Sequence, residues 1–215
     1  MPGITGRIEY QEVKMSSNKY QIAGWLAISQ AVVMPLAYIL KMLQVYLGIS
    51  AFGYKGPTFG PGDLLIITYT CFFVYTFGMF RKLLNERYNV HSLDVLILIA
   101  ILLGIISLIF SLLVQSISLV FEGITTSLFK TIYLSYTAIL IIAAGVVQIL
   151  IAVKLLMVKK SLNDLFNAFA YVTLATGILE VSVILSPLAV LVFLPVWCVM
   201  LGMIFLREKE EAQFV

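Results

Sequence analysis

A long apolar run between Leu93 and Phe121 reads LDVLILIAILLGIISLIFSLLVQSISLVF. Its only charged side chain is that of Asp94, at its start. A helix needs about 20 apolar residues to cross the roughly 30 Å of hydrocarbon in a bilayer, and this run exceeds that length. Its residues do not alternate between apolar and polar, as those of a membrane β-barrel strand do. The run therefore predicts a membrane-spanning helix.

The composition of the whole chain agrees with this prediction. Of the 215 residues, 61% are hydrophobic and 12% are charged. Soluble domains carry about 25% charged residues, so this chain has half the usual share. A water-soluble globule of this size has too little interior to cover so much apolar surface. The composition excludes intrinsic disorder for the same reason.

Five further runs have a similar character, and they cover residues 22–49, 64–80, 132–158, 165–184 and 188–206. We expect an all-α, polytopic membrane bundle of six transmembrane helices over residues 22–206. A polar segment (1–21) precedes it and a short tail (207–215) follows it. Only Leu185-Ser186-Pro187 separates the last two runs, so five spans, or a last pair that forms one bent and partly re-entrant element, are the alternatives.

The basic residues predict how the bundle is oriented. Of the 14 Lys and Arg residues, all but Lys41, Lys55 and Lys130 flank the span ends that a six-span path places on one side. By the positive-inside rule, both termini are expected in the cytoplasm, in a multi-pass protein of the cell's inner (plasma) membrane. The predicted cytoplasmic basic edge, which would meet anionic headgroups, consists of Arg81, Lys82, Arg87, Lys159 and Lys160.

The run 93–121 also carries a stripe of small and polar residues at steps of three or four. After Ala100, the stripe consists of Gly104, Ser107, Ser111, Gln115, Ser118 and Glu122. Such steps place the residues on one helical face. Two interpretations fit this pattern. The stripe forms a tight seam between helices, or it lines a water-filled pore, around an axis of self-association if the protein oligomerises.

Glu180 is the only carboxylate well inside a predicted span. An ionisable group within a membrane is costly and indicates function by default, so Glu180 is a candidate proton or cation site. The alternative is a protonated or snorkelling acid that pairs with a neighbouring helix. In the run 132–158, Ala144, Gln148 and Ala152, with Gly145 beside them, predict a close helix–helix seam in which Gln148 bonds to another helix.

The segment 50–63 is rich in Gly, Pro and aromatic residues. Phe52, Tyr54 and Phe59 are candidates for a binding surface on the outer face, and the alternative is an aromatic belt that anchors the loop among headgroups. Asp63 is expected to be the N-cap of the second span.

Few residues are available for catalysis or metal binding. The chain has one histidine, His91, and two cysteines, both in apolar runs. We therefore expect no metal site, no cofactor, no enzymatic activity and no nucleic-acid partner. The sequence favours a self-associating bundle that acts as a small channel or as the membrane subunit of a larger assembly. The alternatives are a proton- or cation-coupled transporter centred on Glu180, and a sensor or scaffold that recruits a cytoplasmic partner.

Overall fold

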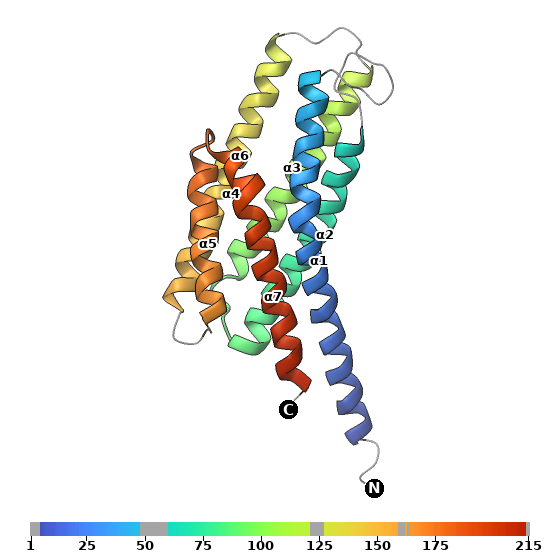
Figure 1. Ribbon diagram of the computed structural model, residues 1–215, viewed down its shortest axis with the longest axis vertical. Coiled ribbons are helices and arrows are strands. Elements are labelled where there is room, and N and C mark those ends of the chain that lie inside the picture. Colours follow the sequence, from blue (N-terminus) through green and yellow to red (C-terminus); the bar gives the residue numbers. More distant parts are fainter. Residues whose placement is uncertain (1–4, 48–59, 121–126, 159–161, 163, 214–215) are drawn as a thin grey trace.

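The computed structural model describes residues 5–47, 60–120, 127–158, 162 and 164–213, and every regular element in these ranges is helical. Figure 1 shows the bundle that the helices form. In chain order, the elements are α1 (Thr5–Leu47), α2 (Pro61–Tyr88), α3 (Asp94–Val120), α4 (Ser127–Met157), α5 (Asp164–Val181), α6 (Ser186–Leu188), the π-helix η2 (Ala189–Phe193) and α7 (Leu194–Gln213).

Six helical segments are long and apolar enough to cross a membrane, so the chain is a multi-pass membrane protein. Within the described residues they are Asn18–Leu43, Pro61–Tyr88, Asp94–Val114, Ser135–Met157, Asp164–Val181 and Ser186–Glu208. The six predicted spans are confirmed. The last pair forms two separate spans, because α5 ends at Val181 and a turn precedes α6. α6, η2 and α7 follow one another without a gap and form the sixth span.

The first span begins, and the last span ends, at the same end of the bundle. Figure 1 shows the N-terminal end of α1 and the C-terminal end of α7 together, beside the turn from α2 to α3. We call this the terminal end, and the turn from α5 to α6 lies at the opposite end. α1 has 43 residues, which correspond to roughly 64 Å of helix, so it extends past the bundle at the terminal end.

The outer surface of the bundle is apolar. Large side chains point away from the protein on several spans, among them Val32 on α1, Leu102 on α3 and Ile139 on α4, each more than half exposed. The interior holds aromatic rings, leucines and a few polar groups, such as Gln30, which donates to Thr76 Oγ1 at 3.1 Å. A surface of this kind suits lipid, because apolar side chains that contact lipid tails are not exposed to water.

Two crossings between helices depend on facing glycines. A Cβ atom placed on Gly145 of α4 would lie 2.7 Å from the carbonyl oxygen of Gly177 of α5. A Cβ atom on Gly202 of α7 would lie 2.8 Å from the carbonyl oxygen of Gly24 of α1. Both distances are too short for a real Cβ, so only glycine permits these backbones to approach so closely. The predicted seam of the fourth span is therefore confirmed, with α5 as its partner.

Two turns between spans contain residues with a positive φ. Asn89 ends α2 with φ 51°, a conformation that asparagine tolerates, and the Val90 N–H then donates to the Leu84 carbonyl at 3.0 Å. Val183, between α5 and α6, has φ 54°. Because valine is β-branched, this conformation is strained, and hydrogen bonds hold the turn: the Val183 N–H donates to the Glu180 carbonyl at 3.0 Å, and the Ser186 N–H donates to the Val183 carbonyl at 3.2 Å.

Candidate functional site

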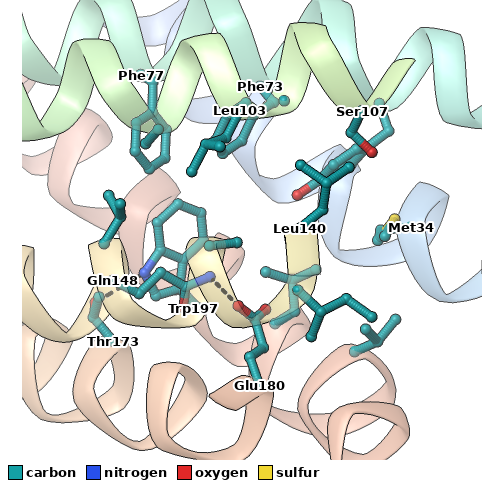
Figure 2. Close-up of a pocket in the computed structure, with 18 of the residues that line it drawn as sticks. Met34, Phe73, Phe77, Leu103, Ser107, Leu140, Gln148, Thr173, Glu180 and Trp197 are labelled. Carbon is teal, nitrogen blue, oxygen red and sulfur yellow. Dashed lines mark hydrogen bonds between the residues drawn. The ribbon is translucent and has the colours of Figure 1, made fainter. Parts of the chain in front are cut away.

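A cavity of about 250 Å³ lies at the centre of the bundle, and Figure 2 shows it in close-up. All six spans contribute to its wall, which is mostly apolar. Its polar lining residues are Tyr38, Tyr69, Thr70, Ser107, Gln148, Thr173, Glu180 and Ser186. Among the described residues that line the cavity, none is Lys, Arg or His. Among these described lining residues, Glu180 is therefore the only one whose side chain is an acid or a base of the kind that is charged near neutral pH.

Glu180 is buried, and its carboxylate is held by one side chain of the neighbouring helix. Gln148 Nε2 donates a hydrogen bond to Glu180 Oε2 at 2.8 Å (Figure 2). The glycine crossing explains this contact. Gln148 lies three residues after Gly145, and Glu180 lies three residues after Gly177. Residues three apart share a helical face, so the close approach of the two glycines brings the amide and the carboxylate together.

The other end of the Gln148 amide has no hydrogen bond in the described part of the protein. Gln148 Oε1 is buried there without a donor. A buried acceptor without a partner is costly, typically about 1–3 kcal/mol. The orientation of the amide follows from the hydrogen bond to Glu180, because the nitrogen must face an ionised carboxylate. The pair therefore presents oxygen atoms that attract a hydrogen-bond donor or a cation.

Aromatic rings form much of the remaining wall. The ring of Trp197 lies 5.4 Å from that of Phe77 and 5.3 Å from that of Phe169, and Phe73 lies 4.3 Å from Phe77. These centroid distances are typical of interacting aromatic pairs. Trp197 Nε1 donates to Thr173 Oγ1 at 2.9 Å, which fixes the indole within the cavity wall. Figure 2 shows Trp197 beside the Gln148–Glu180 pair.

The aromatic contacts continue from the cavity toward the terminal end. Phe80 contacts both Phe169 and Phe166, at 5.6 Å and 6.2 Å between ring centroids, and Phe166 contacts Tyr88 at 5.0 Å. The Tyr88 hydroxyl donates to Glu208, a buried acid near the end of α7. This side of the bundle interior is therefore packed with rings.

The structure divides the polar stripe predicted for the third span. Gly104 and Ser107 line the cavity, and a Cβ atom on Gly104 would lie 3.3 Å from the ring of Phe73 on α2. Ser111 does not line it. The backbone of α3 is described at Gln115 and Ser118, but their side chains lie outside the described part, and Glu122 lies outside it entirely. Gly104 therefore serves as a packing contact, as the seam interpretation predicts, and Ser107 lines an internal space.

The prediction for Asp63 was wrong in its position within the helix. Gly60 is the N-cap of α2, Pro61 follows it, and Asp63 is the third helical residue. The Asp63 carboxylate reaches back to accept the Gly60 N–H at 2.9 Å and forms an ion pair with Lys41 of α1. Proline is favoured at the first helical position, which moves the start of the helix ahead of the acid. The other loop candidates, Phe52, Tyr54 and Phe59, lie outside the described residues.

The described part of the basic edge contains ion pairs. Arg81 Nε lies 2.8 Å from Asp94 Oδ1, which also accepts from Asn85, and Lys82 Nζ lies 3.4 Å from Glu86. Arg87 is exposed. Lys159 and Lys160 lie outside the described residues. Two of the cations thus have acidic partners within the same chain.

The aromatic wall is the part of the site that the sequence interpretation missed. Phe73, Phe77 and Phe80 follow at steps of four and three, which indicates a shared helical face, but phenylalanine is common on every face of a membrane helix. Nothing near Trp197 in the sequence indicates that it lies beside Glu180.

The chain was compared with known proteins. No protein-family model, no curated protein and no solved structure matches it. Within the described part of the chain, no group of three or more His, Cys, Asp or Glu side chains is placed to hold a metal ion. The interpretation of function therefore depends on the geometry of the cavity.

Proposed function

We propose that this protein is a small, non-enzymatic membrane carrier in which Glu180 exchanges a proton for a monovalent cation. The observation that carries the proposal is the position of Glu180. Its carboxylate lies in the wall of a central cavity, inside a membrane span, with a neutral amide as its hydrogen-bond partner.

The energetics of a charge in lipid support exchange at this site. An uncompensated charged side chain at the centre of a membrane helix costs about 2.5–3.5 kcal/mol on insertion scales. In the described part of the bundle, no basic side chain lines the cavity to neutralise Glu180. A bound proton or a bound monovalent cation removes the net charge, and each excludes the other. The two loaded forms are both neutral, so either can cross the membrane's electric field without doing electrical work.

The internal packing favours a carrier over a pore. A channel needs a continuous aqueous path, whereas the interior between the cavity and the terminal end is filled by Phe80, Phe166 and Tyr88. Gly104 of the predicted pore stripe faces Phe73 of the same chain. A carrier needs an enclosed site that opens to one side at a time, which agrees with a central cavity closed by rings on one side.

The proposal is tested in proteoliposomes that contain a pH-sensitive dye in the lumen. Valinomycin with K⁺ at equal concentration on both sides holds the membrane potential at zero. Na⁺ or a quaternary ammonium ion is then added outside. We expect the lumen to become more alkaline, because Glu180 releases the cation into the lumen, takes up a proton there, and releases that proton outside when the site returns. With Glu180→Gln, we expect the rate of alkalinisation to fall at least tenfold.

The matched control is Asp164→Asn, which removes an exposed acid from the first turn of the same helix. We expect it to retain the wild-type rate. The proposal is wrong if no cation moves protons through the wild-type protein, or if Glu180→Gln exchanges as fast as the wild type.

A further inference from the structure

The chemistry of the cavity wall indicates which kind of cation it accepts. We infer that the ligand is an organic monocation with an apolar body, whose charge lies against Glu180 and whose body lies against the aromatic wall. This inference rests on the proposed function and narrows it to a class of substrate.

A bare metal ion does not suit this wall. Inorganic cations require several oxygen ligands to replace their hydration shell, as the six to eight oxygens around calcium illustrate. Besides the Glu180 carboxylate and the Gln148 amide, the side-chain oxygens of the lining are single hydroxyls, which come from five different helices: Tyr38, Tyr69, Thr70, Ser107, Thr173 and Ser186. Thr173 Oγ1 already accepts the indole N–H and donates to the Phe169 carbonyl at 2.7 Å. The described residues that line the cavity are otherwise mostly apolar, so a small inorganic ion would lose more hydration than it regains.

The aromatic rings suit a weakly hydrated organic cation. Trp197, Phe73 and Phe77 line the same cavity as Glu180 and contact one another through their rings. A cation over an aromatic face is attracted by about 0.5–2 kcal/mol, with tryptophan the strongest partner. An apolar body gains further stability by displacing water from this wall. Figure 2 shows Phe73 and Phe77 across the space from the Gln148–Glu180 pair.

A neutral apolar ligand explains less of the site. It would leave an ionised Glu180 carboxylate without a counter-ion, and it would leave Gln148 Oε1, in the orientation that the structure gives it, without an electropositive partner. Buried polar groups left without partners lower the affinity for the wrong ligand. A cation satisfies both groups at once, because the amide oxygen and the carboxylate lie on the same pair of helices.

The experiment compares a charged probe with a neutral molecule of the same shape. Benzyltrimethylammonium carries a fixed charge, and neopentylbenzene replaces its nitrogen by carbon. The protein is studied in detergent with Trp25 changed to Phe, so that Trp197 is the remaining tryptophan of the two in the chain. We expect benzyltrimethylammonium to change the Trp197 fluorescence saturably and to bind at least ten times more tightly than neopentylbenzene.

Two variants distinguish a loss of affinity that comes from removing the Glu180 charge from one that comes from a misfolded cavity. Glu180→Gln keeps a hydrogen-bonding side chain of the same shape, and we expect its affinity for benzyltrimethylammonium to fall at least tenfold while its affinity for neopentylbenzene stays within twofold. Asp164→Asn is expected to bind both probes as the wild type does. Retention of the neutral probe shows that the cavity of the Glu180→Gln variant is folded.

The ligand class is wrong if neopentylbenzene binds as tightly as benzyltrimethylammonium, or if Glu180→Gln binds the charged probe as well as the wild type. If in addition Na⁺ still drives Glu180-dependent proton movement in proteoliposomes, the carrier proposal stands and only the substrate class fails. If neither Na⁺ nor benzyltrimethylammonium drives such movement, the carrier proposal fails as well.

Discussion

Gln148 is the side-chain hydrogen-bond partner of Glu180. Its amide donates to the carboxylate at 2.8 Å, and hydrogen bonds to charged groups contribute about 1.5–3 kcal/mol. The same side chain suits the protonated acid, because a rotated amide offers its oxygen to the carboxyl proton. One residue therefore has a hydrogen bond available to both forms of Glu180, which is what a site that alternates between proton and cation requires.

Loss of the Gln148 amide should therefore slow cation-driven proton exchange. In Gln148→Leu, the ionised carboxylate loses its donor, so we expect cation-driven proton exchange in proteoliposomes to slow about tenfold or more. Ser107→Ala is the control, because Ser107 lines the same cavity from α3. We expect that variant to stay within twofold of the wild-type rate. Equal rates for Gln148→Leu and the wild type would show that the amide has no part in exchange.

The crossing of α4 and α5 is the element that places this pair. A Cβ atom on Gly145 would lie 2.7 Å from the Gly177 oxygen and 2.9 Å from the Val181 nitrogen, both of which are backbone atoms that cannot rotate away. In Gly145→Ala we therefore expect the helices to separate and the protein to lose about 1–3 kcal/mol of stability. Gln148 and Glu180 lie one turn further along, so exchange should slow as well.

The chain offers a matched control for the glycine prediction. Gly78 lies within α2, on the exposed surface, and a Cβ atom there would meet nothing within 4 Å. Since alanine is a better helix former than glycine, Gly78→Ala should leave stability unchanged or raise it by up to about 1 kcal/mol. Thermal unfolding in detergent measures both variants. An unchanged midpoint for Gly145→Ala would contradict the close crossing.

The spans and some of the residues that face the cavity are predictable from the sequence, but the neighbours of these residues are not. Six spans follow from run length and composition, and Glu180 is conspicuous as a lone acid in an apolar run. Gln148 is predictable as a residue that bonds across helices, but its partner is not, because a sequence does not state which helices are neighbours. Trp197 lies on the span that follows Glu180, and the packing of α7 beside α5 brings it to the cavity, which the sequence does not state.

Across the whole molecule, a buried acid, Glu180, lies at a cavity inside a bundle whose outer surface is apolar. Large apolar side chains cover the outside of the bundle, and the N-terminal end of α1 and the C-terminal end of α7 both lie at the terminal end (Figure 1). The distribution of Lys and Arg predicts that this end faces the cytoplasm. Self-association stays a prediction, and all six spans of a single chain contribute to the cavity wall.

Glu180 is proposed as an acid within the membrane that binds either a proton or a cation at the cavity. Dicyclohexylcarbodiimide, an apolar reagent that modifies protonated carboxyl groups, tests this claim directly in intact membranes, with mass spectrometry to locate the product. We expect modification at Glu180, and we expect benzyltrimethylammonium, the kind of cation that the cavity wall suits, to slow it by displacing the proton. An unmodified Glu180, or modification at a rate that neither benzyltrimethylammonium nor Na⁺ changes, would contradict this role of Glu180.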